Sequence, residues 1–152
     1  MNSPESGTLV KHILVAVDGS ENSTRATKIA SVIAHNLNAE LTILHIVSFS
    51  SAMYSDLAPD QLGKIEDQAR QEAEKFVASA SSIATQEGVT AKTAIAEHMD
   101  SVVRGITDYA ERNGIDLIVI GTRGLGGFKR LIIGSVASGV VHYAKCSVLV
   151  VR

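Results

Sequence analysis

Residues 117–135 read LIVIGTRGLGGFKRLIIGS, and this stretch decides the fold expected of the chain. Its first four residues, Leu117–Ile120, are a continuous apolar run, typical of a strand buried on both faces of a parallel sheet. Four glycines follow within residues 121–127, and a Gly134-Ser135 pair leads into a helix-like segment. Clustered glycines indicate positive φ angles or a close approach of the backbone to another group. A strand, a glycine-rich turn and a helix N-terminus together predict a phosphate-binding loop.

Strand-like and helix-like patterns alternate along the rest of the chain. Apolar runs, of which the third is weaker and nearer a sheet edge, predict strands at 13–17, 41–47, 91–96, 117–120 and 147–151. Apolar residues at helical spacing predict helices at 22–37, 59–86, 101–112 and 135–144. The serine-rich segment 48–58 has no clear period, so we expect a long loop there.

This alternation predicts an α/β fold, an open parallel sheet of five strands with helices on both faces. We take the strand order as 3-2-1-4-5, which belongs to Rossmann-like and adenine nucleotide α-hydrolase-like folds and does not follow from the sequence itself. A length of 152 residues fits one domain, which we place at 11–152 behind a flexible tail at 1–10.

The composition excludes several classes of function. A net charge of −2 and the absence of tryptophan disfavour nucleic acid as a partner. The single cysteine, Cys146, rules out an intrachain disulfide framework. The start of the chain lacks the order of a signal peptide, and no apolar run reaches the ~18 residues of a membrane span. We therefore expect a cytoplasmic protein without a membrane partner.

A ligand crevice is expected at the carboxyl ends of the first and fourth strands. In open parallel sheets, ligands bind where the strand order reverses, which for the order 3-2-1-4-5 lies between these strands. Asp18-Gly19-Ser20 follows the first strand, and the glycine run follows the fourth. Composition singles out both segments, and the assumed topology places them side by side.

The two common phosphate-binding fingerprints are absent from this crevice. A Walker A loop needs a lysine directly before its Ser or Thr, but Gly134 precedes Ser135. A G-x-G-x-x-G fingerprint starting at Gly124 would end at Lys129. What remains is G-x-x-G, nine residues and then G-S.

The pattern Gly121-x-x-Gly124-x9-Gly134-Ser135 resembles the nucleotide-binding motif of the universal stress protein family. Ile13–Ser20 and Leu44-His45-Ile46 also resemble that family, so the resemblance covers the chain except its first ten residues. Some members bind ATP, whereas others lack the glycines and do not. This sequence has every glycine of the binding version, which implies ATP, or AMP or ADP, as cofactor, together with Mg²⁺.

The expected nucleotide site joins backbone and side-chain groups. Gly121 and Gly124 would turn backbone N–H groups toward phosphates, and the Gly134-Ser135 helix end would attract an anion. The resemblance adds the neighbouring backbone groups, a pocket lining, and Ile46 as backbone partner of the adenine edge. The full set is Ala16, Val17, Asp18, Ile46, Ile120, Gly121, Arg123, Gly124, Gly134, Ser135, Val136 and Ala137.

Each of these residues also has a purely structural interpretation. The glycines suit a tight connector with positive φ, Ser135 suits an ordinary N-cap, and the apolar residues suit a strand core. Arg123 is the best placed of three loop cations, with Lys129 and Arg130, although a solvated loop also carries such charges.

Asp18 is the candidate metal ligand. The resemblance implies that it lies near the ribose or near a phosphate-bound metal, and one carboxylate holds Mg²⁺ only when phosphates supply most other ligands. The alternative is an aspartate that caps the first helix.

No catalytic apparatus is evident beside this motif, because no Ser–His–Asp set, carboxylate pair or Walker B acid accompanies it. We therefore predict a stress-response protein that acts as a nucleotide-dependent switch, with at most slow ATP hydrolysis and with segments 48–58 and 124–130 as movable parts. The alternatives are an adenine-nucleotide α-hydrolase-type enzyme and a nucleotide-free interaction protein.

The last strand, 147–151, is apolar and forms a sheet edge in the assumed order. Exposed apolar edge strands favour pairing with another chain. The resemblance implies a homodimer in which two such strands pair antiparallel.

Overall fold

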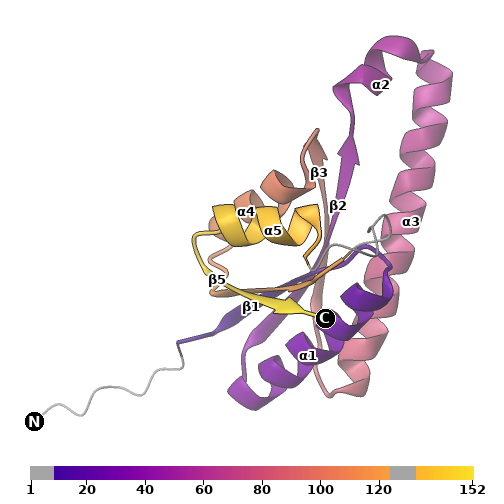
Figure 1. The fold of residues 1–152 in the computed structure, drawn as a ribbon. Helices are drawn as coiled ribbons and strands as arrows, with labels where there is room; N and C mark the ends of the chain where they lie inside the picture. The colour runs from indigo at the N-terminus through magenta and orange to yellow at the C-terminus, as the bar shows by residue number, and fades with distance from the viewer. Residues whose placement is uncertain (1–8, 124–132) are drawn as a thin grey trace, which may run out of the picture.

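Five parallel strands form one sheet in the order β3-β2-β1-β4-β5 (Figure 1). They span β1 His12–Ala16, β2 Glu40–Phe49, β3 Lys92–Met99, β4 Leu117–Gly121 and β5 Ser147–Val151. The computed structural model describes residues 9–123 and 133–152. The α/β fold class and the assumed strand order are both confirmed. Residues 1–8 of the expected tail and the middle of the glycine run lie outside the described residues.

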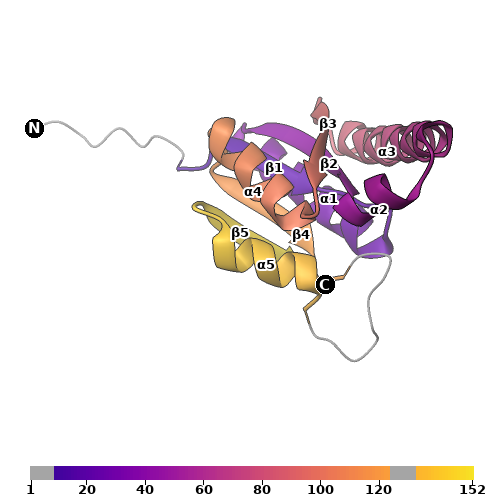
Figure 2. The same cartoon turned by 90° about the horizontal axis from the view of Figure 1, so that it is seen from above.

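Helices lie on both faces of the sheet, as the view from above shows (Figure 2). The helices are α1 Glu21–Leu37, α2 Ser51–Asp56, α3 Pro59–Gln86, α4 Val102–Arg112 and α5 Ser135–Tyr143. Side chains alternate across β1, so Ile13 and Val15 pack in the core under α1 and α3, whereas Leu14 and Ala16 pack under α4 and α5. Residues 13–16 of the central strand thereby pack alternately against the two helix pairs.

Small buried residues explain how the long helix α3 packs. Ala73, Val77, Ala80 and Ala84 are buried at spacings of three and four residues, which places them on one face. Small side chains on that face let a straight 28-residue helix lie close to both the sheet and α1. Within the described residues, no helix combines the length and the apolar character needed to cross a membrane.

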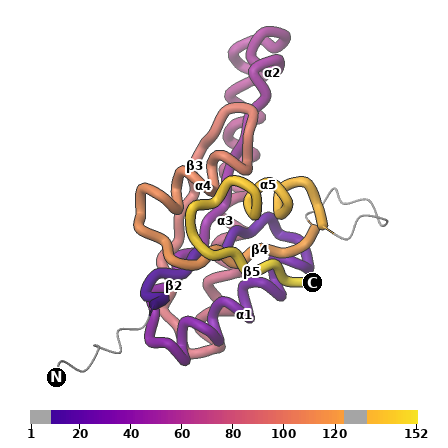
Figure 3. The backbone as a smooth tube through the Cα atoms, turned by 60° about the vertical axis from the view of Figure 1, so that its left-hand side comes forward, coloured from indigo at the N-terminus to yellow at the C-terminus, as the bar shows by residue number. Residues whose placement is uncertain are grey.

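Segment 48–58 is not the long loop expected from its composition. β2 continues to Phe49 and α2 occupies Ser51–Asp56 (Figures 1 and 3). The Ser51 N–H donates to Asp100 Oδ1 at 2.8 Å, and Asp100, with a φ of 62°, donates its own N–H to the Phe49 carbonyl at 3.1 Å. A residue 49 positions away therefore caps this short helix, and no local pattern reveals such a partner.

Candidate functional site

The topological switch point lies between β1 and β4. The two strands pair in parallel, with Ala16 beside Ile120 at their carboxyl ends. From there the chain leaves β1 toward α1 on one face and leaves β4 toward α5 on the other face (Figure 2). The segments beginning at Val17 and Gly121 consequently lie side by side, as the assumed topology required.

The turn between β1 and α1 is shaped by its own side chains. The Ser20 N–H donates to Asp18 Oδ1 at 3.0 Å, and Gly19 adopts a φ of 80°. Ser20 is the N-cap of α1, because its Oγ accepts a hydrogen bond from the Ser23 N–H at 3.1 Å. The alternative interpretation of Asp18 as the helix cap is therefore wrong. Asp18 is half-buried at the rim of the switch point.

Described residues at the two ends of the glycine run are tied to each other and to the sheet. The Thr122 N–H donates to the Val151 carbonyl at 2.7 Å, and the Gly134 N–H donates to the Thr122 carbonyl. A long hydrogen bond of 3.4 Å runs from the Ser20 hydroxyl to the Arg123 carbonyl. Thr122, which the sequence does not single out, is 5% exposed and anchors this junction.

Gly121 and Gly134 allow two backbones to approach closely. A Cβ atom on Gly121 would lie 2.8 Å from the Asn22 carbonyl carbon, and one on Gly134 would lie 2.9 Å from the Thr122 carbonyl oxygen. Gly121 is not among the positive-φ glycines, so the alternative of a positive-φ connector is wrong at that position. Gly124, Lys129 and Arg130 lie outside the described residues.

The N-terminus of α5 has no side-chain cap. Gly134 is its N-cap residue and Ser135 its first helical residue, so the alternative that Ser135 caps the helix is wrong. The Ser138 N–H makes the first intrahelical bond, to the Gly134 carbonyl at 2.9 Å. The N–H groups of Ser135, Val136 and Ala137 precede that bond and have no helical carbonyl to reach. Such a helix end favours an anion.

The N-termini of α1 and α4 lie at the same edge of the sheet and, unlike that of α5, have side-chain caps. Ser20 caps α1, and Ser101 caps α4 by accepting from the Arg104 N–H at 3.1 Å. Their side chains already satisfy one of the orphan donors of the first turn. Within the described residues, α5 differs from α1 and α4 in having no side-chain hydrogen bond at its N-cap.

The apolar site candidates lie on two different faces of the sheet. Ala16, Ile46 and Ile120 are all buried in the core under α4 and α5. Val17 is buried in the opposite core, under α1 and α3. The Val17 side chain therefore points away from the other three, and only its backbone borders the same edge.

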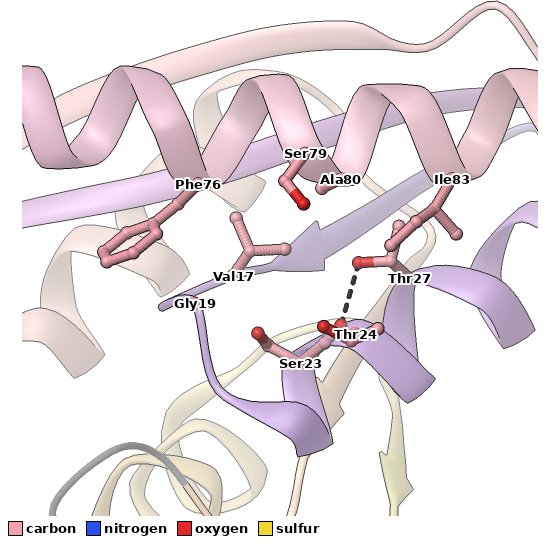
Figure 4. Close-up of a pocket in the computed structure, with 9 residues that line it drawn as sticks. All are labelled: Val17, Gly19, Ser23, Thr24, Thr27, Phe76, Ser79, Ala80 and Ile83. Atoms are coloured by element: carbon pink, nitrogen blue, oxygen red, sulfur yellow. Dashed lines mark hydrogen bonds between the residues drawn. The ribbon is translucent and has the colours of Figure 1, made fainter.

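A small cavity lies behind the turn, between α1 and α3 (Figure 4). Its volume is about 60 Å³, and its lining includes Val17, Gly19, Phe76 and the hydroxyl-bearing residues Ser23, Thr24, Thr27 and Ser79. A cavity that accepts benzene is roughly 150 Å³, whereas a water needs only about 10–15 Å³. This cavity has room for water and none for a nucleobase, so the nucleotide candidate remains the switch-point edge.

The charge at this edge is limited. Arg123 is half-buried beside the crevice, and across the described ranges no group of three or more His, Cys, Asp or Glu side chains gathers into a metal cluster. A divalent cation here would depend on Asp18 together with oxygens of a ligand.

These features define an open, doubly wound α/β fold with its topological switch point between β1 and β4. The model of the universal stress protein family matches residues 10–152, and the chain belongs to that family. The resemblance expected from the glycine motif is thereby confirmed.

Relatives and solved structures of similar length support this assignment. The universal stress protein YxiE of Bacillus subtilis is 34% identical over 146 residues, covering 92% of this chain and 97% of the relative. The structure of the universal stress protein UspA from Lactobacillus plantarum is 31% identical with a TM-score of 0.78, over 94% of this chain and 98% of that chain. A universal stress protein in complex with cAMP is 26% identical with a TM-score of 0.71, over 95% and 99%.

Proposed function

We propose that the protein binds ATP, with AMP or ADP as alternative occupants, at the edge formed by the β1–α1 turn and the start of α5. The observation that carries this proposal is the uncapped α5 N-terminus, whose Ser135, Val136 and Ala137 N–H groups suit a phosphate. The cAMP complex of a 26% identical family member supports an adenine nucleotide as the ligand class.

The other candidate residues have distinct parts in this proposal. Gly121 and Gly124 bring backbone N–H groups toward the phosphates, and Arg123 lowers the repulsion among them. Asp18 contacts the ribose or completes the ligand set of a phosphate-bound Mg²⁺. Ala16 and Ile120 form an apolar wall, and the Ile46 backbone meets the adenine edge.

The protein acts as a nucleotide-dependent regulatory switch with at most slow ATP hydrolysis. A single carboxylate at this edge can help to hold Mg²⁺, but efficient hydrolysis also needs a group that orients the attacking water. Binding without turnover suits a protein that changes shape or partner with its ligand. We place this activity in the cytoplasm and in the response to stress.

The active unit is a homodimer joined through β5. This strand lies at the sheet edge and holds the apolar residues Val148–Val151. Antiparallel pairing of two such edges would satisfy backbone groups and cover these side chains. Light scattering at micromolar concentration should give the dimer mass, and a monomer would contradict this part.

Equilibrium dialysis against ATP, with and without Mg²⁺, tests the nucleotide proposal. Saturable binding of one ATP per chain is expected, with a weaker affinity when Mg²⁺ is removed. An absence of binding at millimolar ATP plus Mg²⁺ would contradict it and would favour an interaction protein without a nucleotide.

A further inference from the structure

We infer that His45 on β2 and Phe76 on α3 are positioning residues that hold the Asp18 turn and leave the Ile46 backbone available to adenine. This inference rests on the proposed nucleotide function and extends it to two side chains that face the opposite side of the sheet from the crevice wall.

The His45 ring donates a hydrogen bond to the backbone carbonyl of Val17, just after β1. Its Nδ1 lies 2.7 Å from the Val17 carbonyl oxygen, and since a carbonyl can only accept, Nδ1 carries the proton. The Val17 N–H donates to the Leu44 carbonyl at 2.9 Å. Both backbone groups of the residue before Asp18 are therefore fixed by consecutive residues of β2.

This arrangement changes the role of Ile46. Backbone groups two residues apart along a strand point the same way, so Ile46, like Leu44, directs its backbone toward β1. In a continued parallel ladder, the Ile46 N–H would donate to the Val17 carbonyl. That carbonyl accepts from the His45 ring, and among the described residues no hydrogen bond from the Ile46 N–H to it is present. The Ile46 N–H thus faces the end of the β1 ladder, where it can donate to a ring nitrogen of adenine.

Phe76 holds the residue on the other side of Asp18. A Cβ atom on Gly19 would lie between 2.3 and 2.9 Å from three atoms of the Phe76 ring, and Gly19 has a φ of 80°. The close-up shows the Phe76 ring above Gly19 at the end of the cavity (Figure 4). A side chain at position 19 would therefore be excluded both by the ring and by the backbone angle.

The two positioning residues also touch each other. The His45 and Phe76 rings meet edge to face, with centroids 5.3 Å apart and an interplanar angle of 62°. Phe76 thereby fixes the orientation of the imidazole that holds Val17 while it covers Gly19. Asp18 lies between two residues that β2 and α3 hold in place.

Substitutions at both positions, with a matched core control, test the inference. His45→Leu removes the donor, His45→Asn keeps an N–H donor, and Phe76→Ala removes the ring. Val77→Ala is the control, because Val77 is buried on the same helix and packs in the core under α1. The readouts are ATP and GTP affinity by calorimetry, thermal unfolding, and amide hydrogen exchange at Val17 and Ser20.

His45→Leu and Phe76→Ala should each weaken ATP binding about five- to tenfold, the worth of about one hydrogen bond. His45→Leu should also reduce the preference for ATP over GTP, since the Ile46 N–H can then rejoin the ladder. His45→Asn should stay within about threefold of the wild type. Val77→Ala should lower the unfolding temperature while leaving ATP affinity unchanged.

The inference is overturned if His45→Leu and Phe76→Ala lower the unfolding temperature but leave ATP affinity and selectivity unchanged. Both residues would then contribute only to packing. If the wild type itself binds no nucleotide, the proposed function fails, and hydrogen exchange then decides. Faster exchange at Val17 and Ser20 in these two variants, but not in Val77→Ala, would still support positioning. Exchange equal to the wild type would refute it.

Discussion

Gly121 lies so close to Asn22 that a Cβ atom at position 121 would stand 2.8 Å from the Asn22 carbonyl carbon. This contact brings the end of β4 against the first turn of α1 and sets the width of the switch point. The glycine of the motif therefore has a packing role, whether or not a ligand is present.

Replacing Gly121 with alanine should destabilise the protein by about 1–3 kcal/mol, because the contacting Asn22 atoms include rigid helix backbone. Gly63→Ala is the matched control, since nothing lies within 4 Å of a Cβ there and the residue sits inside α3. That change should stabilise by about 0.5–1 kcal/mol. Urea unfolding measures the change in unfolding free energy in both variants. Equal changes would show that the close contact between Gly121 and Asn22 does not exclude a Cβ atom.

Ser135→Pro should weaken ATP binding about ten- to a hundredfold, the effect of losing one charge-assisted N–H donor. Proline is tolerated at the first helical position, and Gly134, with φ −71° and ψ 165°, already has the conformation that precedes a proline. Ser135→Ala separates the hydroxyl from the N–H and should cost much less. Calorimetry measures the ATP affinity of both variants. Equal affinities would show that the Ser135 N–H at the start of α5 does not bind the phosphates.

Ser20→Ala should destabilise the fold by about 1 kcal/mol, as loss of an N-cap generally does. Ser101→Ala removes a cap of the same 3.1 Å geometry from α4, away from β1 and β4, and should destabilise similarly. Only Ser20→Ala should also weaken ATP binding, because the Ser20 hydroxyl donates to the Arg123 carbonyl at the proposed site. Matching losses of affinity in both variants would point to a global effect.

Asp116 should make stability depend on acid pH. Its Oδ2 accepts from the Lys11 and His12 N–H groups at 2.8 and 2.9 Å, and these bonds lower the pKa of its carboxyl. A lowered folded-state pKa gives stability that is present above the unfolded value, near 3.9, and is lost as pH falls through the folded value. Because Asp116 is largely solvated, the contribution should be less than about 1 kcal/mol.

Chemical unfolding of the wild type and of Asp116→Ala at several pH values measures this contribution. The difference in unfolding free energy should be constant from neutral pH down to about pH 5 and should shrink toward pH 2. A difference independent of pH over that range would show that the carboxylate charge does not stabilise the two N–H groups.

The fold was largely predictable because strand and helix patterns are local. The apolar runs and the β-α alternation together define a parallel sheet, and the confirmed strand order places Asp18 near Gly121. Segment 48–58 was mispredicted because α2 is stabilised by Asp100, which the chain reaches only after α3 and β3. The local periodicity of residues 48–58 contains no information about such a distant partner.

The position of the candidate segments in the fold was more predictable than their contacts. Glycine clustering and the Asp-Gly-Ser turn singled out two segments, and the pairing of β1 with β4 brings Asp18 and Gly121 to one edge of the sheet. The helix caps were not assigned correctly, because Asp18, Ser20, Gly134 and Ser135 are all plausible caps until backbone angles are known. His45 lies in the Leu44-His45-Ile46 stretch that resembles the family, but its contact with the turn, like that of Phe76, depends on how β2 and α3 pack around the turn.

A crystal structure of the protein grown with millimolar ATP and Mg²⁺ tests the central claim most directly. Phosphate density is expected within hydrogen-bond distance of the Ser135, Val136 and Ala137 nitrogens, with the adenine edge at the Ile46 backbone. ATP bound elsewhere, or a crevice empty of nucleotide at that concentration, would contradict it.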